Sequence, residues 1–178
     1  MTTDPAPVDR GAFRDAMARW ATGVSVVTAH ADGADAGLTV NAFLSVALDP
    51  PSVLVALTQD VDTLPVLEKS GAFAVCVLAA DQRAVSERFA RAIPTAEKFR
   101  GVGVHRGTTG APLLDGALAT LECRVARVLP VYDHRLVIGE VERLERGPDG
   151  APLLFYRSGY ADAGPDGTVR LPPPRSPR

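Results

Sequence analysis

Features that define several protein classes are scarce in this chain. It has two cysteines, Cys76 and Cys123, and both lie in apolar runs, so we expect buried thiols in a reducing cytoplasm and no disulfide framework. The net charge of −2 gives no electrostatic reason to expect nucleic acid or an anionic membrane as a main partner. No apolar run reaches the ~18 residues that a membrane-spanning helix needs, so no span is expected.

The usual catalytic motifs are also missing. The histidines, His30, His105 and His134, show no metal-ligand spacing, and the two cysteines are far apart, so no metal site is expected. There is no Gly-x-Ser-x-Gly elbow of a serine hydrolase and no P-loop. Gly101-x-Gly103 is not a dinucleotide fingerprint, because the third glycine is misplaced and no strand–turn–helix pattern surrounds it. If the chain is an enzyme, we expect a bound cofactor to supply the difficult chemistry.

Short apolar runs joined by short links dominate what is present. Helices are predicted at 10–21, at 64–70 and after Asp81. Strands are predicted at 24–29, 38–45, 52–58, 73–78, 116–129, 135–145 and 153–157. Because strands outnumber helices and regular βαβ alternation is weak, we expect a mainly β fold with covering helices, either a barrel or a sandwich.

The length of 178 residues and the hydrophobic content of 46% suit one domain with a substantial core. We expect a flexible leader at 1–10, the folded domain at 11–160 and a flexible, proline-rich tail at 161–178. The first predicted helix has an apolar stripe that includes Phe13 and Trp20. This stripe is expected to pack on the core.

The segment 37–51 is polar for a strand in an apolar region. Its residues alternate with a period of two, which places Thr39, Asn41 and Ser45 on one face. Buried hydroxyl and amide groups need hydrogen-bond partners. Two interpretations stay open: the partners are neighbouring backbone groups, or they belong to a polar, ring-shaped ligand. The residues just before, 31–37, have the composition of a turn.

The start of the helix at 64–70 is a second candidate site. Thr63 is expected to be its N-cap. Because the helix closely follows a strand, its free N–H groups and its dipole could hold an anion such as phosphate, although ordinary capping is the alternative. The basic, glycine-rich segment 98–110 could cover a ligand as a loop or lid.

A series of segments, taken in order, resembles the flavin reductase family, the small reductase components of two-component flavin-dependent monooxygenases. They are TGVSVVT (22–28), GLTVNAFLSVALDPPSVLVAL (37–57), DTLPVLEKSGAFAVCVL (62–78), SERFA (86–90), KF (98–99), PLLDGALATLEC (112–123), DHRLVIGEV (133–141) and PLLFYRSGY (152–160). The resemblance covers about residues 11–160. Two blocks are specific in combination: Thr-x-Asn-(Ala/Ser)-Phe-x-Ser-x-(Ser/Ala)-x-Asp-Pro-Pro and Asp-His-x-Leu-x-x-Gly-x-Val.

The resemblance implies an FMN-binding split β-barrel, usually a homodimer with the flavin near the subunit interface. It implies that NADH or NADPH transfers a hydride from nicotinamide C4 to flavin N5 of FMN or FAD. The reduced flavin would then diffuse to a partner oxygenase. Two alternatives stay open on the same barrel: an oxidase or oxygenase that retains its flavin, and a non-catalytic flavin- or haem-binding module.

The family pattern also implies flavin-binding residues by position. Those along the isoalloxazine ring would be Thr39, Val40, Asn41 and Ala42. Those toward the ribityl chain and the phosphate would be Ser45, Asp62 and Thr63. Members often have serine where this chain has Val61, so one hydroxyl near the phosphate is missing here.

The nicotinamide end has its own implied residues. His134, beside Asp133 at the link between two long strands, would contact the nicotinamide and is the catalytic candidate. Tyr156 and Arg157 would lie nearby. Turn composition alone favours the alternative, a solvated histidine held by Asp133.

Overall fold

A computed structural model describes residues 7–164 and 168–170 of the protein. The helices are α1 (Arg10–Met17), α2 (Thr63–Ser70), α3 (Arg83–Phe89) and α4 (Thr95–Phe99), with a 3-10 turn η1 (Ala80–Gln82) before α3. The strands are β1 (Thr22–Gly23), β2 (Ser25–Ala31), β3 (Ala34–Val40), β4 (Phe43–Leu48), β5 (Pro51–Thr58), β6 (Ala72–Val77), β7 (Val104–Arg106), β8 (Pro112–Leu114), β9 (Ala119–Val131), β10 (His134–Arg146), β11 (Leu153–Tyr156), β12 (Gly159–Ala163) and β13 (Val169–Arg170). Most of the predicted leader and tail lies outside the described residues.

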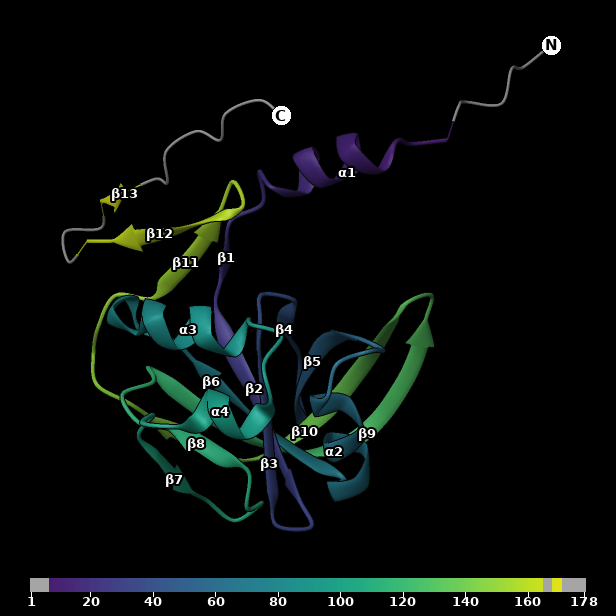
Figure 1. Cartoon of the computed structure of the whole chain (residues 1–178), viewed down its shortest axis with the longest axis vertical. Helices are drawn as coiled ribbons and strands as arrows, with labels where there is room; N and C mark the ends of the chain where they lie inside the picture. Colours follow the sequence, from purple (N-terminus) through teal and green to yellow (C-terminus); the bar gives the residue numbers. More distant parts are fainter. Residues whose placement is uncertain (1–6, 165–167, 171–178) are drawn as a thin grey trace.

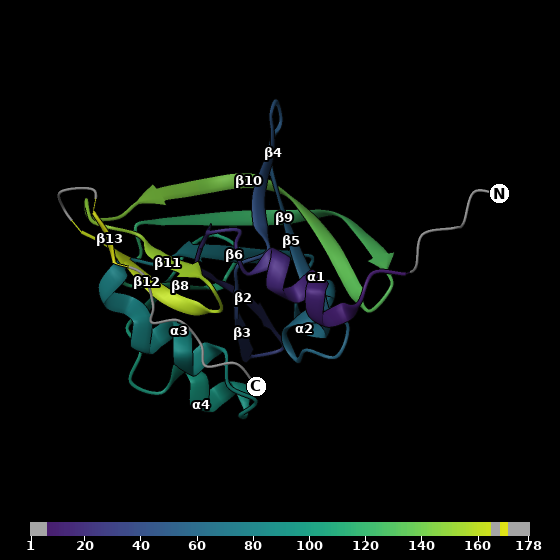
Figure 2. The same ribbon diagram turned by 90° about the horizontal axis from the view of Figure 1, so that it is seen from above.

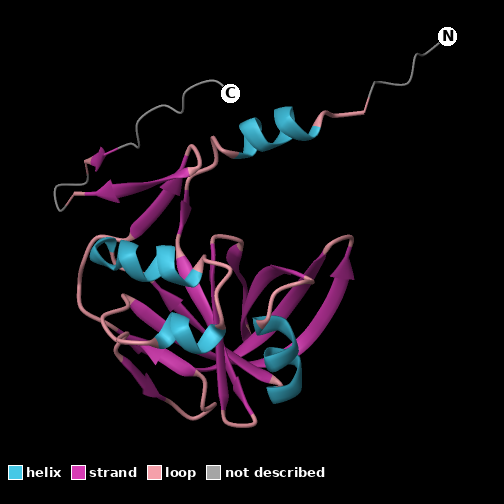
Figure 3. Cartoon of the chain, in the orientation of Figure 1, coloured by secondary structure: helices cyan, strands magenta, loops and turns pink. Residues whose placement is uncertain are grey.

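The main sheet has the strand order β3-β2-β6-β9-β10-β5-β4, and every neighbouring pair is antiparallel (Figures 1 and 3). A smaller sheet, β1-β11-β12-β13, extends from it, and β7 pairs with β8. The helices α2, α3 and α4 pack on this framework, with α3 and α4 together over one face (Figure 2). The predicted mainly β fold with covering helices is confirmed.

The main sheet is curled into a barrel with one open seam. β3 and β4 are at opposite edges of the sheet, although only Asn41 and Ala42 separate them in the chain. Three Cα steps span at most about 11 Å, so the two edges must come together at this point. Ala42 accepts a backbone hydrogen bond from Ala56 of β5 (3.0 Å), but no ladder joins β3 to β4 within the described part of the chain. The barrel is therefore split beside Asn41.

The two larger of three apolar clusters form most of the core. The first fills the barrel with fully buried side chains such as Val27 and Phe73, and Leu67 of α2 joins it, so that α2 closes one end. The second lies on the other face of β2, where Val26 packs with Phe89 of α3. Because neighbouring residues of β2 point to opposite faces, this strand is buried on both sides.

The predicted bulge at Gly139 is confirmed. The register between β9 and β10 shifts between Ile138 and Gly139. A Cβ added at Gly139 would lie 2.5 Å from the Phe73 ring and 2.8 Å from Cβ of Cys123, so a larger residue cannot fit without a shift of its neighbours. The bulge thus lets β10 pass close to the barrel core.

The first helix differs from its prediction in length and in packing. α1 ends at Met17, four residues before the predicted end at 21, and none of its residues is buried. Phe13 is 60% exposed and Trp20, just after the helix, is 69% exposed. In Figure 1 α1 extends beyond the sheet at the end that carries β1 and β11. The expectation that this stripe packs on the core of its own chain is therefore wrong.

Two predictions around residue 40 are also wrong. The predicted turn at 31–37 is restricted to Asp32 and Gly33, because β3 begins at Ala34. The single strand predicted at 38–45 is divided by a bend at Asn41. The residues before the bend form β3, which pairs with β2, and the residues after it form β4, which pairs with β5.

Two further findings concern the cysteines and membrane contact. Both thiols are free and buried, and burial raises the pKa of Cys76 and of Cys123 to about 12, so neither is a ready nucleophile. Of the helices described, none has the length and apolar character needed to cross a membrane.

Candidate flavin site

A cleft of about 670 Å³ opens where β3 and β5 end, at the start of α2 and beside the segment that follows α3. Its walls are formed by Leu38, Thr39, Thr58, Asp60, Val61, Asp62, Thr63, Phe89, Ala90, Arg91, Ala92, Ile93, Pro94 and Lys98. The cleft thus brings the two polar sequence features, the segment around Thr39 and the helix start, to one place.

The start of α2 forms one wall of this cleft. Asp62 is the N-cap and Thr63 the first helical residue, so the predicted cap at Thr63 is one position too late. The Asp62 side chain makes no capping hydrogen bond. The N–H of Leu64 donates to the carbonyl of Val61 (3.2 Å), and Pro65 has no N–H. The remaining N–H groups of the first turn and the helix dipole favour an anion here.

Two cationic side chains also line the cleft, and sequence reasoning placed neither of them there. Arg91 is exposed, whereas Lys98 is only 9% exposed. The Lys98 ammonium donates to the carbonyls of Gly37 (3.2 Å) and Phe89 (3.3 Å). Burial lowers the pKa of Lys98, and the negative charge of Asp62 acts in the opposite direction.

Thr39 lines the cleft but its hydroxyl proton is already used. Its Oγ1 donates to the carbonyl of Ser86 in α3 (2.7 Å), and the Ser86 hydroxyl is 2.8 Å from the Tyr160 hydroxyl. Thr39 can therefore only accept a hydrogen bond from a ligand. It also ties β3 to α3, which keeps two walls of the cleft together.

Asn41 lies at the seam, outside this cleft. It is exposed and lines a second hollow of about 280 Å³, which we call the groove, together with Trp20, Thr22 and Phe43 among others. The Thr22 hydroxyl is buried and has no hydrogen-bond partner within the described residues. One short segment of chain therefore borders both hollows, with Thr39 in the cleft and Asn41 in the groove.

The other predicted ring and phosphate contacts are distributed around the same bend. Val40 points into the core and is 7% exposed, so only its backbone can meet a ligand. Ala42 is exposed at the seam, and Ser45 is exposed on the edge strand β4 and lines neither hollow. The predicted common face of Thr39, Asn41 and Ser45 is wrong, because the bend turns them in different directions.

His134 begins β10, directly opposite Thr58 of β5, which lines the cleft. Its side chain is 42% exposed, and its Nδ1 lies 2.7 Å from Oδ1 of Asp133. This hydrogen bond to His134 lowers the pKa of Asp133. His134 is thus beside the cleft, one strand away from its lining.

Tyr156 and Arg157 are not brought to the cleft of their own chain. They lie at the turn between β11 and β12, where the Arg157 guanidinium is 5.3 Å from the centre of the Tyr156 ring. The N–H of Arg157 donates to the carbonyl of Ala18, just after α1 (2.8 Å). Neither residue lines the cleft or the groove.

Comparison with known proteins shows which family this chain is similar to. A family model described as flavin reductase like domain matches residues 17–164. The chain is 42% identical over 149 residues to the reductase component of 4-hydroxyphenylacetate 3-monooxygenase from Thermus thermophilus, with 84% of this chain and 93% of that protein covered. It is 36% identical over 152 residues to the FMN reductase (NADH) RutF of Cronobacter sakazakii, covering 85% and 92%.

A solved structure agrees with these relatives. The Streptomyces globisporus NADH:FAD oxidoreductase SgcE6, in complex with NAD and FAD fragments, superposes with a TM-score of 0.83 at 35% identity, covering 90% of this chain and 96% of that one.

The chain belongs to the flavin reductase-like family.

The family relation confirms three predictions at once. The fold is the split β-barrel, the activity is NAD(P)H-dependent flavin reduction, and the relatives include reductase components of two-component monooxygenases. Val61, where members often have serine, lines the cleft and packs against the barrel core, so it offers a ligand no hydroxyl.

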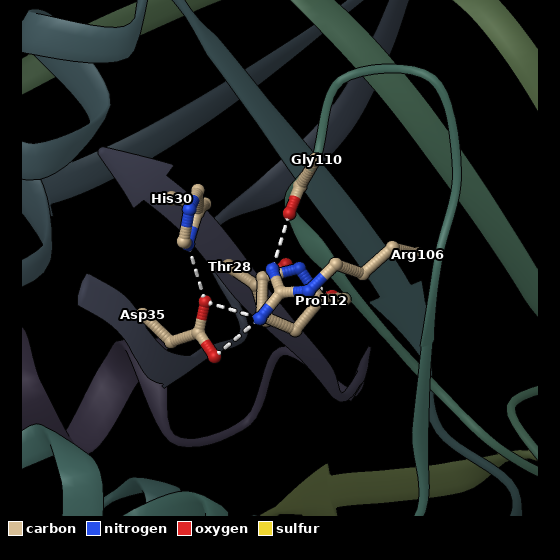
Figure 4. Close-up of polar contacts among 6 residues, drawn as sticks. All are labelled: Thr28, His30, Asp35, Arg106, Gly110 and Pro112. Carbon is tan, nitrogen blue, oxygen red and sulfur yellow. Dashed lines mark hydrogen bonds and ion pairs between the residues drawn. The ribbon is translucent and has the colours of Figure 1, made fainter. Parts of the chain in front are cut away.

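The segment 98–110 is held against the main sheet by hydrogen bonds. Arg106 donates two hydrogen bonds to Asp35 of β3 (2.8 and 2.9 Å), and His30 Nδ1 lies 2.7 Å from the same carboxylate (Figure 4). Although burial alone would raise it, these partners lower the pKa of Asp35. The Thr28 hydroxyl donates to the carbonyl of Pro112, the first residue of β8 (2.6 Å). The segment is thus anchored to the sheet, and of its residues only Lys98 lines the cleft.

In the described part of the chain, His, Cys, Asp and Glu side chains form no group of three or more that could hold a metal ion. The polar groups of the cleft are the helix start, the cationic side chains of Lys98 and Arg91, hydroxyl oxygens, and the carboxylates of Asp60 and Asp62. All of these except the carboxylates suit an anionic, polar ligand.

Proposed function

We propose that the protein binds the phosphate end of FMN or FAD in the cleft and reduces the flavin with NADH or NADPH. The observation that carries this proposal is the meeting of the α2 start and the buried Lys98 in one cleft. Both are phosphate-binding groups. The volume of about 670 Å³ also lies in the usual range of small-molecule sites.

The flavin would lie along the bend between the two hollows. Asp62 and Thr63 would present the helix start to the phosphate, and the run 39–42 would follow the isoalloxazine ring. Because the Val40 side chain is buried and Thr39 can only accept, most of the donors would be backbone N–H groups and the Asn41 amide. Ser45 would reach the ribityl chain only if the ligand extends past the seam.

A bound flavin supplies the ring that accepts the hydride. The chain's own contribution is placement and electrostatics: donors along the bend stabilise negative charge on the ring, and the walls fix the ring for close stacking. No protein side chain needs to exchange a proton during hydride transfer. This agrees with a bend that carries hydroxyl, amide and backbone groups.

His134 would contact the nicotinamide end of NADH or NADPH. It is opposite Thr58 at the rim of the cleft, and Asp133 holds its ring from one side. The other ring nitrogen is then available to orient the dinucleotide. In this role His134 positions the hydride donor and does not itself transfer a proton.

The working unit would be a homodimer. Exposed apolar side chains gather near the groove and on the edge strand β4, including Trp20 (69% exposed) and Leu48 (93% exposed). Tyr156 and Arg157 share no hollow with the flavin-binding run of their own chain. A two-fold axis through this surface would cover the groove and could carry Tyr156 and Arg157 to the partner's site.

The reduced flavin would pass to an oxygenase, as the names of relatives such as the Thermus thermophilus reductase component imply for those proteins. A cytoplasmic location is part of the proposal, because two buried free thiols suit a reducing compartment.

The test is oxidation of NADH and NADPH by the purified protein with FMN, FAD or riboflavin added. We expect turnover that depends on added flavin and a product flavin that is released. Turnover without added flavin would indicate a flavin-retaining enzyme. No turnover with any flavin, from protein that binds flavin, would contradict the proposed activity.

A further inference from the structure

Lys98 differs from the other charged residues of the cleft because it is buried. Its neighbours in the lining, Asp60, Asp62 and Arg91, are exposed, whereas Lys98 retains 9% of its surface. A buried charge is costly unless it is compensated. The carbonyls of Gly37 and Phe89 each accept from the ammonium, which has three N–H donors. Its third donor has no protein acceptor within the part of the chain that is described.

Asp62 supplies the opposing charge. It lies in the same cleft, and its carboxylate acts electrostatically on Lys98 without a hydrogen bond to it. As the N-cap of α2 it makes no side-chain capping bond, so its carboxylate does not satisfy the helix start. The positive charge of Lys98 and the negative charge of Asp62 therefore have opposite effects on an anionic ligand in the cleft.

We propose that Lys98 and Asp62 form an opposed pair that sets the affinity of the cleft for the phosphate of the flavin, Lys98 strengthening binding and Asp62 weakening it. This inference rests on the proposed function. A buried ammonium is screened less by solvent than an exposed carboxylate, so the effect of Lys98 is the larger. The pair selects phosphorylated flavins over riboflavin.

The weakening by Asp62 has a use in this chemistry. An enzyme that supplies reduced flavin must let it leave, and a phosphate held by an unopposed lysine and a helix start would dissociate slowly. Asp62 lowers the attraction without touching the ring contacts, which lie at the bend. Release therefore becomes faster while the position of the ring is retained.

The experiment compares FMN with riboflavin, which lacks the phosphate. Dissociation constants are measured by fluorescence quenching for the wild type, Lys98→Met and Asp62→Asn. Met keeps an apolar stem in the buried position, and Asn is as good an N-cap as Asp, so the helix start is preserved. Lys69→Met, which removes the other lysine of the chain at an exposed site on α2, is the matched control.

We expect Lys98→Met to weaken FMN binding tenfold or more and to leave riboflavin binding within about twofold, a tenfold change being about 1.4 kcal/mol. Asp62→Asn should strengthen FMN binding about threefold to tenfold and slow its dissociation, with riboflavin again unchanged. Lys69→Met should alter neither ligand.

Equal losses of FMN and riboflavin in Lys98→Met would overturn the inference, because Lys98 would then only hold the cleft walls. Weaker FMN binding in Asp62→Asn would do the same. Should Lys98→Met fail to fold, Asp62→Asn decides: its FMN affinity must rise while its riboflavin affinity does not change. A wild type that binds neither flavin would refute the proposed function itself, whereas one that binds both equally would refute this inference and the phosphate position but not flavin reduction.

Discussion

The cleft and the groove lie on either side of the same bend, but they differ in the charge of their linings. The cleft is lined by charged side chains, among them the buried Lys98 at 9% exposure and the exposed Asp62 and Arg91. Among the described residues, the groove has no charged residue in its lining, and its exposed members include Trp20 and Asn41. On the proposed function, the cleft would hold the phosphate within one subunit, and the exposed groove would be covered by the second subunit.

The largest expected effect compares a residue of the barrel core with one at the groove. Phe73→Ala removes a fully buried ring and should lower the free energy of unfolding by about 3–5 kcal/mol. Trp20→Ala should change monomer stability far less, because the ring is 69% exposed. Urea unfolding of both variants at a concentration where the protein is monomeric measures this. Equal losses would mean that the segment after α1 packs on its own chain after all.

The second effect is on assembly. Leu48→Asp places a charge on the exposed edge strand and should weaken the proposed dimer about a hundredfold or more, equivalent to about 2.7 kcal/mol. Light scattering over a dilution series gives the mass, and flavin reduction should fall with the dimer. Ala84→Asp, on the exposed side of α3, adds the same charge away from the groove and should stay dimeric. A wild type that is monomeric and fully active would contradict the proposed dimer.

The contrast between the two halves also explains what sequence reasoning could reach. The period of two around Thr39 predicts a strand. It does not show where the chain stops pairing with β2 and begins to pair with β5, so the bend at Asn41 was missed. The stripe of Phe13 and Trp20 predicts an amphipathic helix near α1. It does not say whether the apolar face meets the chain's own core or another subunit.

Lys98 shows the same limit in the cleft. Its burial depends on carbonyls of Gly37 and Phe89, 61 and 9 positions away, and no local pattern encodes that meeting. The start of α2, by contrast, was predicted from sequence to within one residue, because capping and termination at Gly71 are local. Family resemblance identified the fold and activity, since ordered motifs carry information that single residues do not.

A third effect concerns the rim between the two halves. His134→Ala should raise the Michaelis constant for NADH or lower turnover about tenfold, equivalent to about 1.4 kcal/mol, because the hydride donor loses a positioning contact. Flavin affinity should barely change. Steady-state kinetics with NADH varied at saturating FMN, together with a flavin titration, separates these effects. His105→Ala is the matched histidine control, since His105 lines neither hollow. Unchanged NADH kinetics in His134→Ala would leave nicotinamide recognition to Tyr156 and Arg157.

The smallest expected effect lies away from both hollows, at His105. Its Nδ1 is 2.7 Å from Asp115 and its Nε2 is 3.0 Å from Glu145, and these hydrogen bonds raise the pKa of His105 above its usual value of 6.5. A raised pKa in the folded state means that the protonated ring stabilises the fold. This contribution is complete below about pH 6.5 and is lost as the pH rises through the raised value.

Because His105 is 46% exposed, the contribution is small, as exposed ion pairs usually add only about 0–1 kcal/mol. In the wild type, the free energy of unfolding should decline above about pH 6.5 as His105 loses its proton. His105→Gln should remove this part of the decline. Urea midpoints at a series of pH values from 6 to 9 measure the difference between the two proteins, roughly spanning the expected titration. Flavin reduction should be unaffected, because the ring joins β7 to β10 and touches neither the cleft nor the groove. Parallel pH profiles for the two proteins would show that the two carboxylates do not favour the charged ring.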